Sequence, residues 1–304
     1  MADLDIALFQ KFYPAKLLLF GEHTVLLGSD ALAVPVQKLG GRWQPNPNPP
    51  NPLPEHLNLS TFFNYLSKMP IFQSDTGGGL FLNDINQLFF DSNIPRGYGA
   101  GSSGALTAAA LDLFAHAGAK IPTDLADLKR LLGEMESFFH GASSGLDPLV
   151  SYLNKTILIR PTKMETLETN SFFSKNIFLL DTNRPRKAET MITFFKENVV
   201  KKHQLEVENQ LLPNVARAIA AFSDCNETEI FEAFHQISDT QYQICRDMIP
   251  LPFQHLWRDA LCEDVFRLKL CGAGGGGFIL GFAKNPTLAA QQLQKKGFKM
   301  LSVF

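Results

Sequence analysis

The segment Pro95-Arg96-Gly97-Tyr98-Gly99-Ala100-Gly101-Ser102-Ser103-Gly104-Ala105 is the feature from which the rest of the chain can be interpreted. It has glycine at alternate positions and then two serines, directly before Leu106-Thr107-Ala108-Ala109-Ala110-Leu111, which has the composition of a helix. Glycine lets the backbone turn tightly and approach a ligand, and the free N–H groups at a helix N-terminus favour an anion. The segment therefore predicts a phosphate site, where a serine hydroxyl caps the helix or ligates a hard cation. No Lys follows the glycines as in GxxxxGK[ST], and a glycine-rich loop with an ordinary Ser cap is the alternative interpretation.

The bulk properties indicate a globular protein that acts on small molecules. The 304 residues suit one large domain or two of ordinary size, and 45% hydrophobic residues are enough for real cores. A net charge of −2, with both signs interspersed, predicts neither a nucleic-acid nor a membrane partner. The four cysteines form no CxxC pair and follow no signal peptide, and no apolar run is long enough to span a bilayer. We therefore expect reduced thiols and a cytoplasmic protein.

Three polar side chains, Lys16, Glu22 and His23, lie in an otherwise apolar amino-terminal stretch. We expect strands over Asp5 to Tyr13 and Lys16 to Phe20, interrupted by Pro14. Taken singly, each polar residue is accounted for as a surface or strand-end residue. A functional cluster needs a partner elsewhere in the chain.

A helix-to-loop segment in the middle of the chain carries two acidic residues. Apolar residues at three- and four-residue spacing from Leu125 to Phe139 predict an amphipathic helix, flanked by Glu136 and His140. The segment Gly141 to Gly145 ends this helix, and Asp147 follows. Asp147 either caps the next helix or is a buried carboxylate aimed at a site.

The carboxy-terminal part contains a second glycine-rich loop. Five glycines stand between Gly272 and Gly277, and because such a run is costly in conformational entropy, close backbone approach to a ligand is the better explanation. A change to helical character beyond Asn183 places a domain boundary there. The other expected elements are strands at 31–36, 80–82, 156–160, 176–181, 265–270, 278–282 and 298–304, helices at 57–68, 188–203, 206–223, 228–248 and 288–296, and a Pro-rich loop at 44–55.

Three motifs in order along the chain together resemble the GHMP kinase family. They are Pro14-Ala15-Lys16-Leu17-Leu18-Leu19-Phe20-Gly21-Glu22-His23, the segment Pro95 to Ala105, and Lys269-Leu270-Cys271-Gly272-Ala273-Gly274-Gly275-Gly276-Gly277. Within that family they are most similar to the mevalonate kinase branch, on the strength of Lys16 and of the segment Glu136 to Asp147. The chain departs from that branch at Gly104, where Ala is usual, and at Tyr13, Ala15 and Phe278, which weakens the substrate assignment.

The resemblance implies an α+β, two-domain kinase. Residues 1–183 would form an amino-terminal domain of ribosomal S5 type, and residues 184–304 a ferredoxin-like carboxy-terminal domain. It implies ATP and Mg²⁺ as cofactors, with Asp147 as base or orienter of the substrate hydroxyl and Lys16 beside it. The remaining roles that it implies are Mg²⁺ ligands at Ser103 and Glu136; ATP contacts at Pro95, Gly97, Gly99, Gly101, Ser102, Ser103, Gly104, Gly274 and Gly275; and acceptor contacts at Glu22, His23, Gly272 and Ala273.

The expected activity is transfer of a phosphoryl group to a small-molecule hydroxyl, foremost that of mevalonate, in a monomer or homodimer. Phosphomevalonate, a sugar or another hydroxy acid are the alternative acceptors. A phosphorylated acceptor would need additional cations, for which Arg96, Arg184 and Arg186 are the candidates. A non-catalytic binding protein on the same fold is the second alternative, although Lys16, Glu136 and Asp147 are all present.

Overall fold

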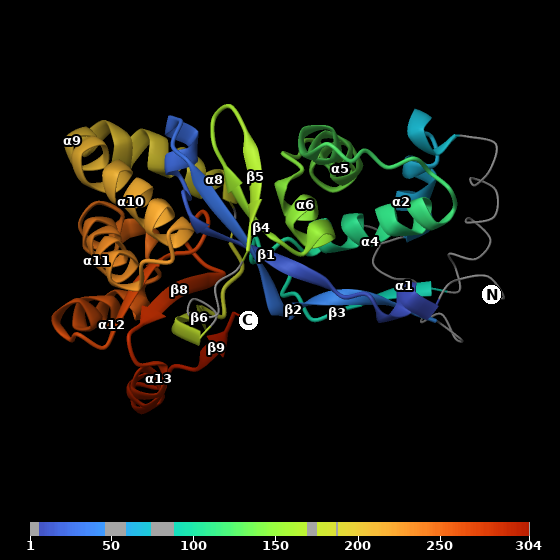
Figure 1. Ribbon diagram of the computed structural model, residues 1–304. Helices are drawn as coiled ribbons and strands as arrows, with labels where there is room; N and C mark the ends of the chain where they lie inside the picture. The colour runs from blue at the N-terminus through green and yellow to red at the C-terminus, as the bar shows by residue number, and fades with distance from the viewer. Residues whose placement is uncertain (1–5, 46–58, 74–87, 169–174, 187, 304) are drawn as a thin grey trace. The chain divides into compact units, whose positions relative to one another are not determined.

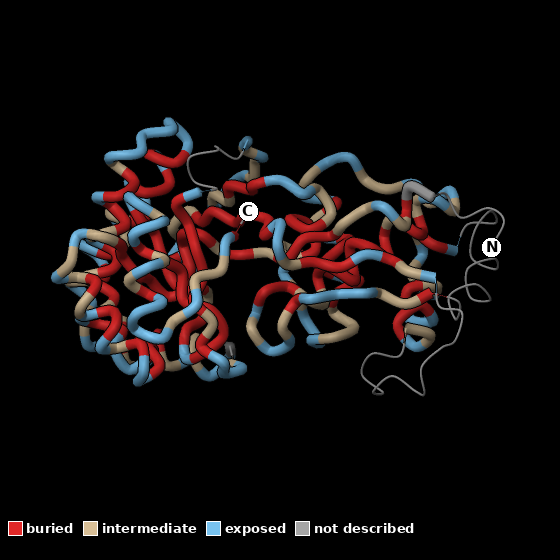
Figure 2. The backbone as a smooth tube through the Cα atoms, turned by 90° about the horizontal axis from the view of Figure 1, so that it is seen from below, coloured by how far each residue is buried: buried red, intermediate tan, exposed pale blue. Residues whose placement is uncertain are grey.

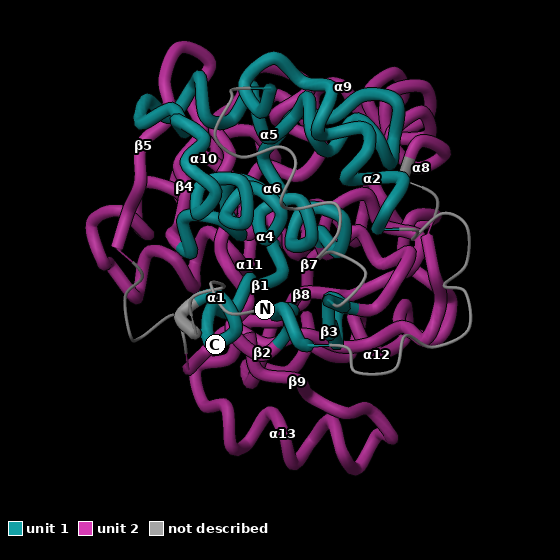
Figure 3. Tube along the Cα trace, turned by 90° about the vertical axis from the view of Figure 1, so that its right-hand side faces the viewer, with its two compact units in different colours: residues 1–16, 39–94, 101–154 teal, residues 17–38, 95–100, 155–304 magenta. Residues whose placement is uncertain are grey.

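The computed structural model describes residues 6–45, 59–73, 88–168, 175–186 and 188–303 (Figure 1). The chain divides into two compact units, each assembled from several segments (Figure 3). Unit 1 comprises residues 1–16, 39–94 and 101–154, and unit 2 comprises residues 17–38, 95–100 and 155–304. The expected domain boundary between residues 183 and 184 lies within unit 2 and stays a prediction.

Unit 1 contains a small bundle of helices. The elements are α1 (Ile6–Gln10), α2 (Leu59–Leu66), the short turn η3 (Pro70–Phe72), α4 (Ser102–His116), α5 (Leu125–His140) and α6 (Leu146–Leu153). Helix α4 packs against both α5 and α6, and its small residues from Gly104 to Ala110 are buried on every side. The indole N–H of Trp43 donates to the carbonyl of Ala109 at 3.0 Å, which fixes strand β2 against this helix. Helix α4 is therefore the central element of the unit.

A five-stranded sheet has the strand order β1-β2-β4-β5, and β3 pairs with β2. Its strands are β1 (Tyr13–Phe20), β2 (Ala31–Pro45), β3 (Leu88–Ser92), β4 (Thr156–Ile159) and β5 (Met164–Leu167). In unit 1, β2 pairs antiparallel with β3 from Gly41↔Ser92 to Pro45↔Leu88. In unit 2, its first residues pair antiparallel with β4, from Ala31↔Ile159 to Ala33↔Ile157. Strand β2 thus belongs to both units.

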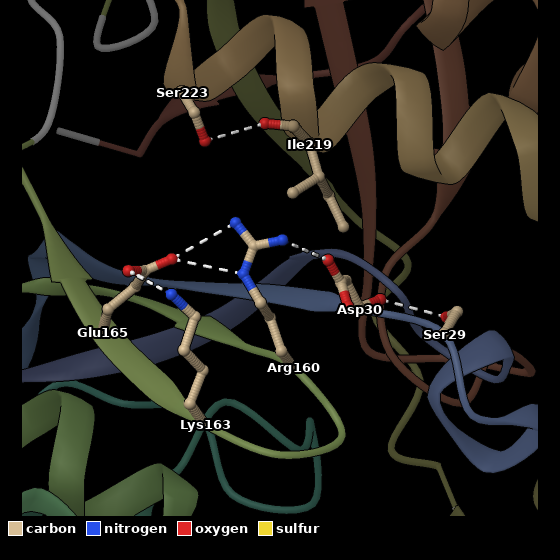
Figure 4. A network of polar contacts seen from close by, with 7 residues as sticks. All are labelled: Ser29, Asp30, Arg160, Lys163, Glu165, Ile219 and Ser223. Carbon is tan, nitrogen blue, oxygen red and sulfur yellow. Dashed lines mark hydrogen bonds and ion pairs between the residues drawn. The ribbon is translucent and has the colours of Figure 1, made fainter.

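A polar network in unit 2 ties the start of β2 to the β4–β5 hairpin (Figure 4). Arg160 pairs with Asp30 at 3.0 Å and with Glu165 at 3.2 Å. Lys163 also pairs with Glu165, at 3.3 Å. Ser29, next to Asp30, donates its hydroxyl to Thr24 Oγ1 at 2.8 Å, so the network continues into the turn η1 (Thr24–Leu27).

The second sheet, in unit 2, gives the carboxy-terminal half its ferredoxin-like topology. Strands β6 (Ile177–Asp181), β7 (Phe266–Leu270), β8 (Phe278–Ala283) and β9 (Met300–Ser302) are antiparallel in the order β7-β8-β6-β9. With one helical segment after β6 and another after β8, this is the βαββαβ arrangement of that fold. Strands β6, β7 and β8 consist almost entirely of buried residues, and Figure 2 maps burial along the chain.

Unit 2 also contains most of the helices. They are α8 (Ala188–Phe194), which continues as the π-helical η5 (Phe195–Val200), α9 (Gln204–Glu206), the π-helical η6 (Val207–Leu211), α10 (Leu212–Ser223), α11 (Glu227–Ile244), the turn η7 (Arg246–Met248), α12 (Leu251–Cys262) and α13 (Pro286–Lys295). Helix α11 packs on β7, and its neighbours α10 and α12 flank it. Pro213 does not break the helical segment: the π-helical η6 runs directly into α10 through Leu211 and Leu212, which both have right-handed helical backbones, and Pro213 follows that π-helical turn.

Two expectations about the amino terminus were wrong. Residues 6–10 form the helix α1 instead of a strand, and Pro14 lies inside β1 instead of interrupting it. Proline is tolerated there because β1 is the end strand of the order, where a residue without an N–H group breaks no ladder. Strands β3 and β5 and helix α12 were not expected. The Pro-rich loop beyond residue 45 and the strand expected at 80–82 lie outside the described residues.

Among the described residues, no helix combines the length and the apolar character needed to cross a membrane.

Candidate active site

Lys16 and Asp147 form an ion pair in unit 1. Lys16 lies on β1 and Asp147 in the first turn of α6, and Lys16 Nζ is 2.6 Å from Asp147 Oδ1. The Asp147 side chain is 28% exposed, so the carboxylate can still meet a ligand. Gly145 is the N-cap residue of α6, which shows that the capping interpretation of Asp147 is wrong. The structure therefore brings together the two residues to which the resemblance gave catalytic roles.

The N-terminus of α4 adjoins this pair. Its N-cap residue is Gly101, in a left-handed conformation with φ 76°, and no side chain caps the helix. Neither Ser102 nor Ser103 is the N-cap, so the interpretation as an ordinary Ser cap is wrong. Because the first amides of a helix lack intrahelical acceptors, this terminus can bind an anion.

Asp147 lies beside Gly101 and Gly104, and Gly104 is the glycine that its close approach requires. A Cβ added to Gly101 would lie 3.4 Å from Asp147 Oδ2. A Cβ added to Gly104 would lie 2.8 Å from the backbone carbon of Asp147 and from the nitrogen of Pro148, closer than real Cβ atoms come. Gly104 departs from the usual Ala of the mevalonate kinase branch, and its neighbours explain the difference: the first turn of α6 occupies the space of a side chain.

Glu136 is the centre of a hydroxyl cluster between α4 and α5. Its Oε1 accepts from Ser103 Oγ at 2.8 Å, and its Oε2 accepts from Ser143 Oγ at 2.5 Å. His140 Nε2 lies 3.0 Å from Ser103 Oγ. Because the single hydroxyl proton of Ser103 goes to Glu136, the His140 ring donates to Ser103. Glu136 and His140 are four residues apart, which puts them on one face of α5.

The electrostatics of Glu136 suit a bound cation. Burial raises the pKa of Glu136, and the negative charge of Asp147 raises it further, while the Ser143 and Ser103 hydroxyls lower it. No group of three or more His, Cys, Asp or Glu residues able to hold a metal occurs among the described residues. One carboxylate with neighbouring hydroxyls nonetheless fits Mg²⁺, which prefers oxygen ligands and retains waters and phosphate oxygens in its shell.

In unit 2, Glu22 and His23 are both buried. Glu22 pairs with Lys269 of β7 at 2.6 Å, and burial raises its pKa while Lys269 lowers it. The Nε2 of His23 lies 3.1 Å from the carbonyl of Ala273, so this nitrogen carries the hydrogen. The His23 ring stacks on Phe195, with centroids 4.5 Å apart and an interplanar angle of 19°. Burial lowers the pKa of His23 to about 4, and the ring is neutral at neutral pH.

Arg186 connects two glycine-rich loops of unit 2. Its backbone N–H donates to the carbonyl of Gly97 at 2.9 Å, and its guanidinium donates to the carbonyls of Gly99, at 3.3 Å, and of Cys271. Of the three arginines considered for a phosphorylated acceptor, Arg186 is thus bound to backbone carbonyls, whereas Arg96 and Arg184 are exposed.

The loop after β7 is held by hydrogen bonds to neighbouring segments of unit 2. The N–H groups of Gly275 and Gly277 donate to the carbonyls of Met248, at 2.8 Å, and of Arg184, at 2.7 Å. The hydroxyl of Thr182 donates to the carbonyl of Gly277 at 2.7 Å. The N–H of Gly275 therefore has a protein acceptor, and a nucleotide contact at this residue would have to use other atoms.

Several residues of these clusters were not among the candidates from the sequence. They are His140, Ser143, Lys269, Phe195, Arg186 as a link between loops, and Gln241, whose side-chain amide donates to Glu22 Oε1 at 2.8 Å. The i, i+4 spacing of Glu136 and His140 is a signal that could have found His140. Lys269 is part of the third motif, but no local pattern connects it to Glu22.

Comparison with known proteins agrees with this fold. Residues 66–155 match the family described as GHMP kinases N terminal domain. A mevalonate kinase of Dictyostelium discoideum is 23% identical over 357 residues, covering 91% of this chain and 88% of that protein. A mevalonate kinase of Pyrococcus horikoshii is 22% identical over 307 residues, covering 89% of this chain and 87% of that protein.

Solved structures with the same fold include kinases of different names. The mevalonate kinase of Methanococcus jannaschii superposes with a TM-score of 0.66 at 17% identity, covering 97% of this chain and 98% of that chain. Streptococcus pneumoniae phosphomevalonate kinase in complex with phosphomevalonate and AMPPNP gives 0.67 at 16% identity, covering 96% and 98%. Lactococcus lactis galactokinase complexed with galactose gives 0.62 at 16% identity, covering 96% and 92%.

The chain therefore carries the amino-terminal domain of the GHMP kinases and has their two-domain α+β fold, which confirms the resemblance inferred from its motifs. Both relatives that it matches along most of their length are named mevalonate kinase.

Proposed function

We propose that this protein is an ATP-dependent kinase that phosphorylates the hydroxyl group of a small molecule, and that mevalonate is the acceptor. The observation that carries the proposal is the Lys16–Asp147 pair, at 2.6 Å, directly beside the uncapped N-terminus of α4. Phosphoryl transfer needs alignment of the reacting groups and neutralisation of charge more than covalent chemistry. A carboxylate, a lysine and an anion-binding helix terminus meet those needs.

Asp147 accepts a hydrogen bond from the acceptor hydroxyl and orients its oxygen towards the γ-phosphate. Lys16 holds the Asp147 carboxylate in place, keeps it ionised and stabilises the charge on the transferring phosphoryl group. The ATP phosphates are assigned to the loop and the first turn of α4. The residues concerned are Pro95, Gly97, Gly99, Gly101, Ser102, Ser103 and Gly104, with Gly274 and Gly275 as further contacts.

Ser103 and Glu136 are the residues that would hold Mg²⁺. When bound, Mg²⁺ supplies positive charge to the phosphate oxygens. His140 and Ser143 orient these two ligands by donating to Ser103 Oγ and to Glu136 Oε2. The repulsion between Glu136 and Asp147 that raises the pKa of Glu136 is relieved by a cation at this place.

Binding of the acceptor molecule is assigned to His23, Gly272 and Ala273, with Glu22 behind them. The choice of mevalonate is supported by two relatives of that name that cover most of the chain. Phosphomevalonate and galactose are the acceptors named in two solved structures of the same fold, and both therefore belong in the test.

The test is ADP release by the purified protein with Mg·ATP and, in turn, mevalonate, phosphomevalonate, galactose and homoserine. Release that depends on mevalonate supports the proposal. ADP release with another acceptor keeps the kinase activity and replaces mevalonate as the acceptor. No ADP release with any of the four leaves either an acceptor outside this panel or a binding protein on the kinase fold.

The Asp147→Asn variant ties the activity to this site. Losing the carboxylate should lower turnover by about 10²- to 10⁴-fold while leaving ATP binding largely intact. The matched control is Asp127→Asn on α5, whose side chain is 55% exposed and pairs with Arg130. Near-normal turnover in Asp147→Asn would show that the role given to Asp147 is wrong.

A further inference from the structure

Glu22 and Lys269 form the most deeply buried ion pair among the described residues of the chain. Their side chains are 3% and 0% exposed, and Lys269 Nζ is 2.6 Å from Glu22 Oε1. Gln241 of α11 joins the pair by donating its amide to Glu22 Oε1 at 2.8 Å. Three residues that lie far apart in the sequence, after β1, on α11 and on β7, therefore meet in the interior of unit 2.

The buried position of Glu22 separates its role from that of a substrate ligand. One carboxylate oxygen, Oε1, has both Lys269 and Gln241 as partners. The other, Oε2, has no hydrogen-bond partner in the described part of the chain and has almost no accessible surface. An acceptor molecule cannot reach either oxygen in this arrangement.

Two members of this cluster, Lys269 and Gln241, hold the backbone of Leu270. Leu270 is the last residue before the loop from Cys271 to Gly277, which belongs to the third motif and is called the third glycine loop below. Lys269 Nζ donates to the carbonyl of Leu270 at 2.8 Å, and the N–H of Leu270 donates to Gln241 Oε1 at 2.8 Å. Both polar backbone groups of Leu270 are thus bound to the cluster. The loop therefore leaves β7 from a fixed point.

A second contact closes a ring. His23, the residue after Glu22, donates from Nε2 to the carbonyl of Ala273 in that loop at 3.1 Å. Its backbone has φ 65° and ψ −46°, and the N–H of Thr24 donates to the carbonyl of Glu22 at 2.8 Å, so His23 is at the centre of a γ-turn, a strained conformation that persists only where the surroundings impose it. The ring runs from Glu22 through Lys269, Leu270 and Ala273 to His23 and back to Glu22 along the chain.

We propose that Glu22, Lys269 and Gln241 are positioning residues that fix the third glycine loop and, through Ala273, the His23 ring. The part of this inference that concerns the acceptor rests on the proposed function, since His23 and Ala273 are assigned there to acceptor binding. The part that concerns the loop does not depend on it. Glu22 acts on the reaction only through the backbone of the loop and the position of His23.

The loss of one charge from a buried ion pair has a different effect from the loss of both charges, and this difference supplies a test. Removing one partner leaves an uncompensated charge in the interior, whereas replacing both ions by neutral residues of similar size is often tolerated. A residue that instead contacts the acceptor would not regain its function when Lys269 is also changed. The decisive variants are Glu22→Gln, Lys269→Met and the two combined, since glutamine at position 22 can still bond to Gln241.

The first readouts are thermal unfolding and hydrogen exchange of a peptide spanning residues 269–278. Each single variant should lower Tm by about 10 °C, and exchange in the loop should be faster. The double variant should return close to the parent in Tm. Its loop should recover only part of the protection from exchange, because Gln241 still binds the N–H of Leu270 while methionine at position 269 cannot donate to the Leu270 carbonyl. Lys163→Met, which breaks an exposed pair on the β4–β5 hairpin, is the matched control and should leave loop exchange unchanged.

The second readout is steady-state kinetics with mevalonate and ATP. The single variants should raise KM for the acceptor at least tenfold with a smaller change in KM for ATP, and the double variant should come back within about threefold of the parent. Single variants that fail to fold while the double variant folds also support the proposal.

Two results would overturn the proposal. One is a double variant that is as unstable and as exchange-prone as the singles. The other is a double variant with normal stability and partly recovered loop protection that still cannot bind the acceptor, which would make Glu22 an acceptor ligand. If the parent phosphorylates none of the acceptors tested, the proposed function fails, and stability and exchange still decide whether the ring positions the loop.

Discussion

For the Gly104→Ala substitution, the family resemblance and the structure predict opposite effects on stability. Ala is the usual residue of the mevalonate kinase branch at this position, and in a helix it is favoured over Gly by about 1 kcal/mol, so sequence similarity predicts a stabilised protein. In this structure the added Cβ would lie 2.8 Å from the backbone of Asp147 and Pro148, about 0.6 Å short of the 3.4 Å at which ordinary contact begins. The first turn of α6 must therefore move.

Moving that turn affects both stability and turnover. Overpacking of this kind costs about 1–3 kcal/mol and the gain in helix propensity is about 1 kcal/mol, so the net loss of stability should be up to about 2 kcal/mol. Asp147 moves with the turn, and because a misplacement of about 1 Å can cost about 10²-fold in rate, a shift of about 0.6 Å should lower kcat about tenfold.

The assay is urea denaturation for the free energy of unfolding, together with kcat at saturating mevalonate and ATP. Gly133→Ala on α5 is the matched comparison, since its Cβ would lie 3.0 Å from the carbonyl of Ser143, a smaller overlap. It should lose less stability than Gly104→Ala. A Gly104→Ala protein that is more stable than the parent and turns over at the parental rate would refute the reasoning.

The remaining predictions concern pH and the polar network. Burial and the charge of Asp147 raise the pKa of Glu136, so its stabilising contribution is present below the usual pKa of 4.5 and is lost as the pH rises through the raised value. The Tm of Glu136→Gln should therefore increase relative to that of the parent as the pH rises above 4.5, and a constant Tm difference would contradict this. Burial lowers the pKa of His23 from 6.5 to about 4, so between these pH values the unfolded chain binds a proton that the folded chain does not. The parent should therefore lose about 3 kcal/mol of its free energy of unfolding between pH 6.5 and 4, and His23→Gln should not lose it. Denaturation at both pH values measures this difference. Arg160→Met should cost about 1 kcal/mol or less in urea denaturation, because its side chain is 39% exposed; a loss above about 2 kcal/mol would give the network a larger structural role.

The parts of the fold that were predicted have local causes. The expected helix from Leu125 matches α5 because its apolar residues repeat at helical spacing and Asp124 caps it by accepting from the amides of Ala126 and Asp127. The strand after the third glycine loop matches β8 because it is a short apolar run that follows glycine. The strand before the loop matches β7 because its apolar residues alternate with Arg267 and Lys269 up to the loop.

The parts that were missed depend on partners elsewhere. The apolar run at 6–10 is too short for its period to separate helix from strand, and it forms α1. Strand β5 has only four residues, two of them polar, and it depends on the backbone of β4, with which it pairs from Thr156↔Leu167 to Ile159↔Met164. Helix α12 begins with Pro252 in its first turn, where proline starts a helix and does not end one.

The residues of the candidate site also fall into those that could be predicted and those that depend on distant partners. Lys16 and Asp147 were expected together because a family resemblance carries information about distant pairs that residue patterns lack. The sequence hypothesis placed Glu22 at the acceptor, and the structure places its carboxylate against Lys269 and against Gln241, 219 positions later in the chain. Burial and long-range pairing of this kind have no local signature.

Arg186 changes the interpretation of Gly99 in the second motif and of Gly272 in the third motif. A Cβ on Gly99 would lie 2.0 Å from Arg186 Nη2, and one on Gly272 would lie 2.5 Å from the same atom, while the guanidinium is held in place by the carbonyls of Gly99 and Cys271. These glycines make room for the protein's own side chain. Positions 99, 186 and 272 should therefore be inherited as a set: in lineages where Arg186 is replaced by a shorter residue, the space at 99 and 272 opens. Since both glycines also have positive φ, at 65° and 66°, the residues that enter first should be Asn and Asp.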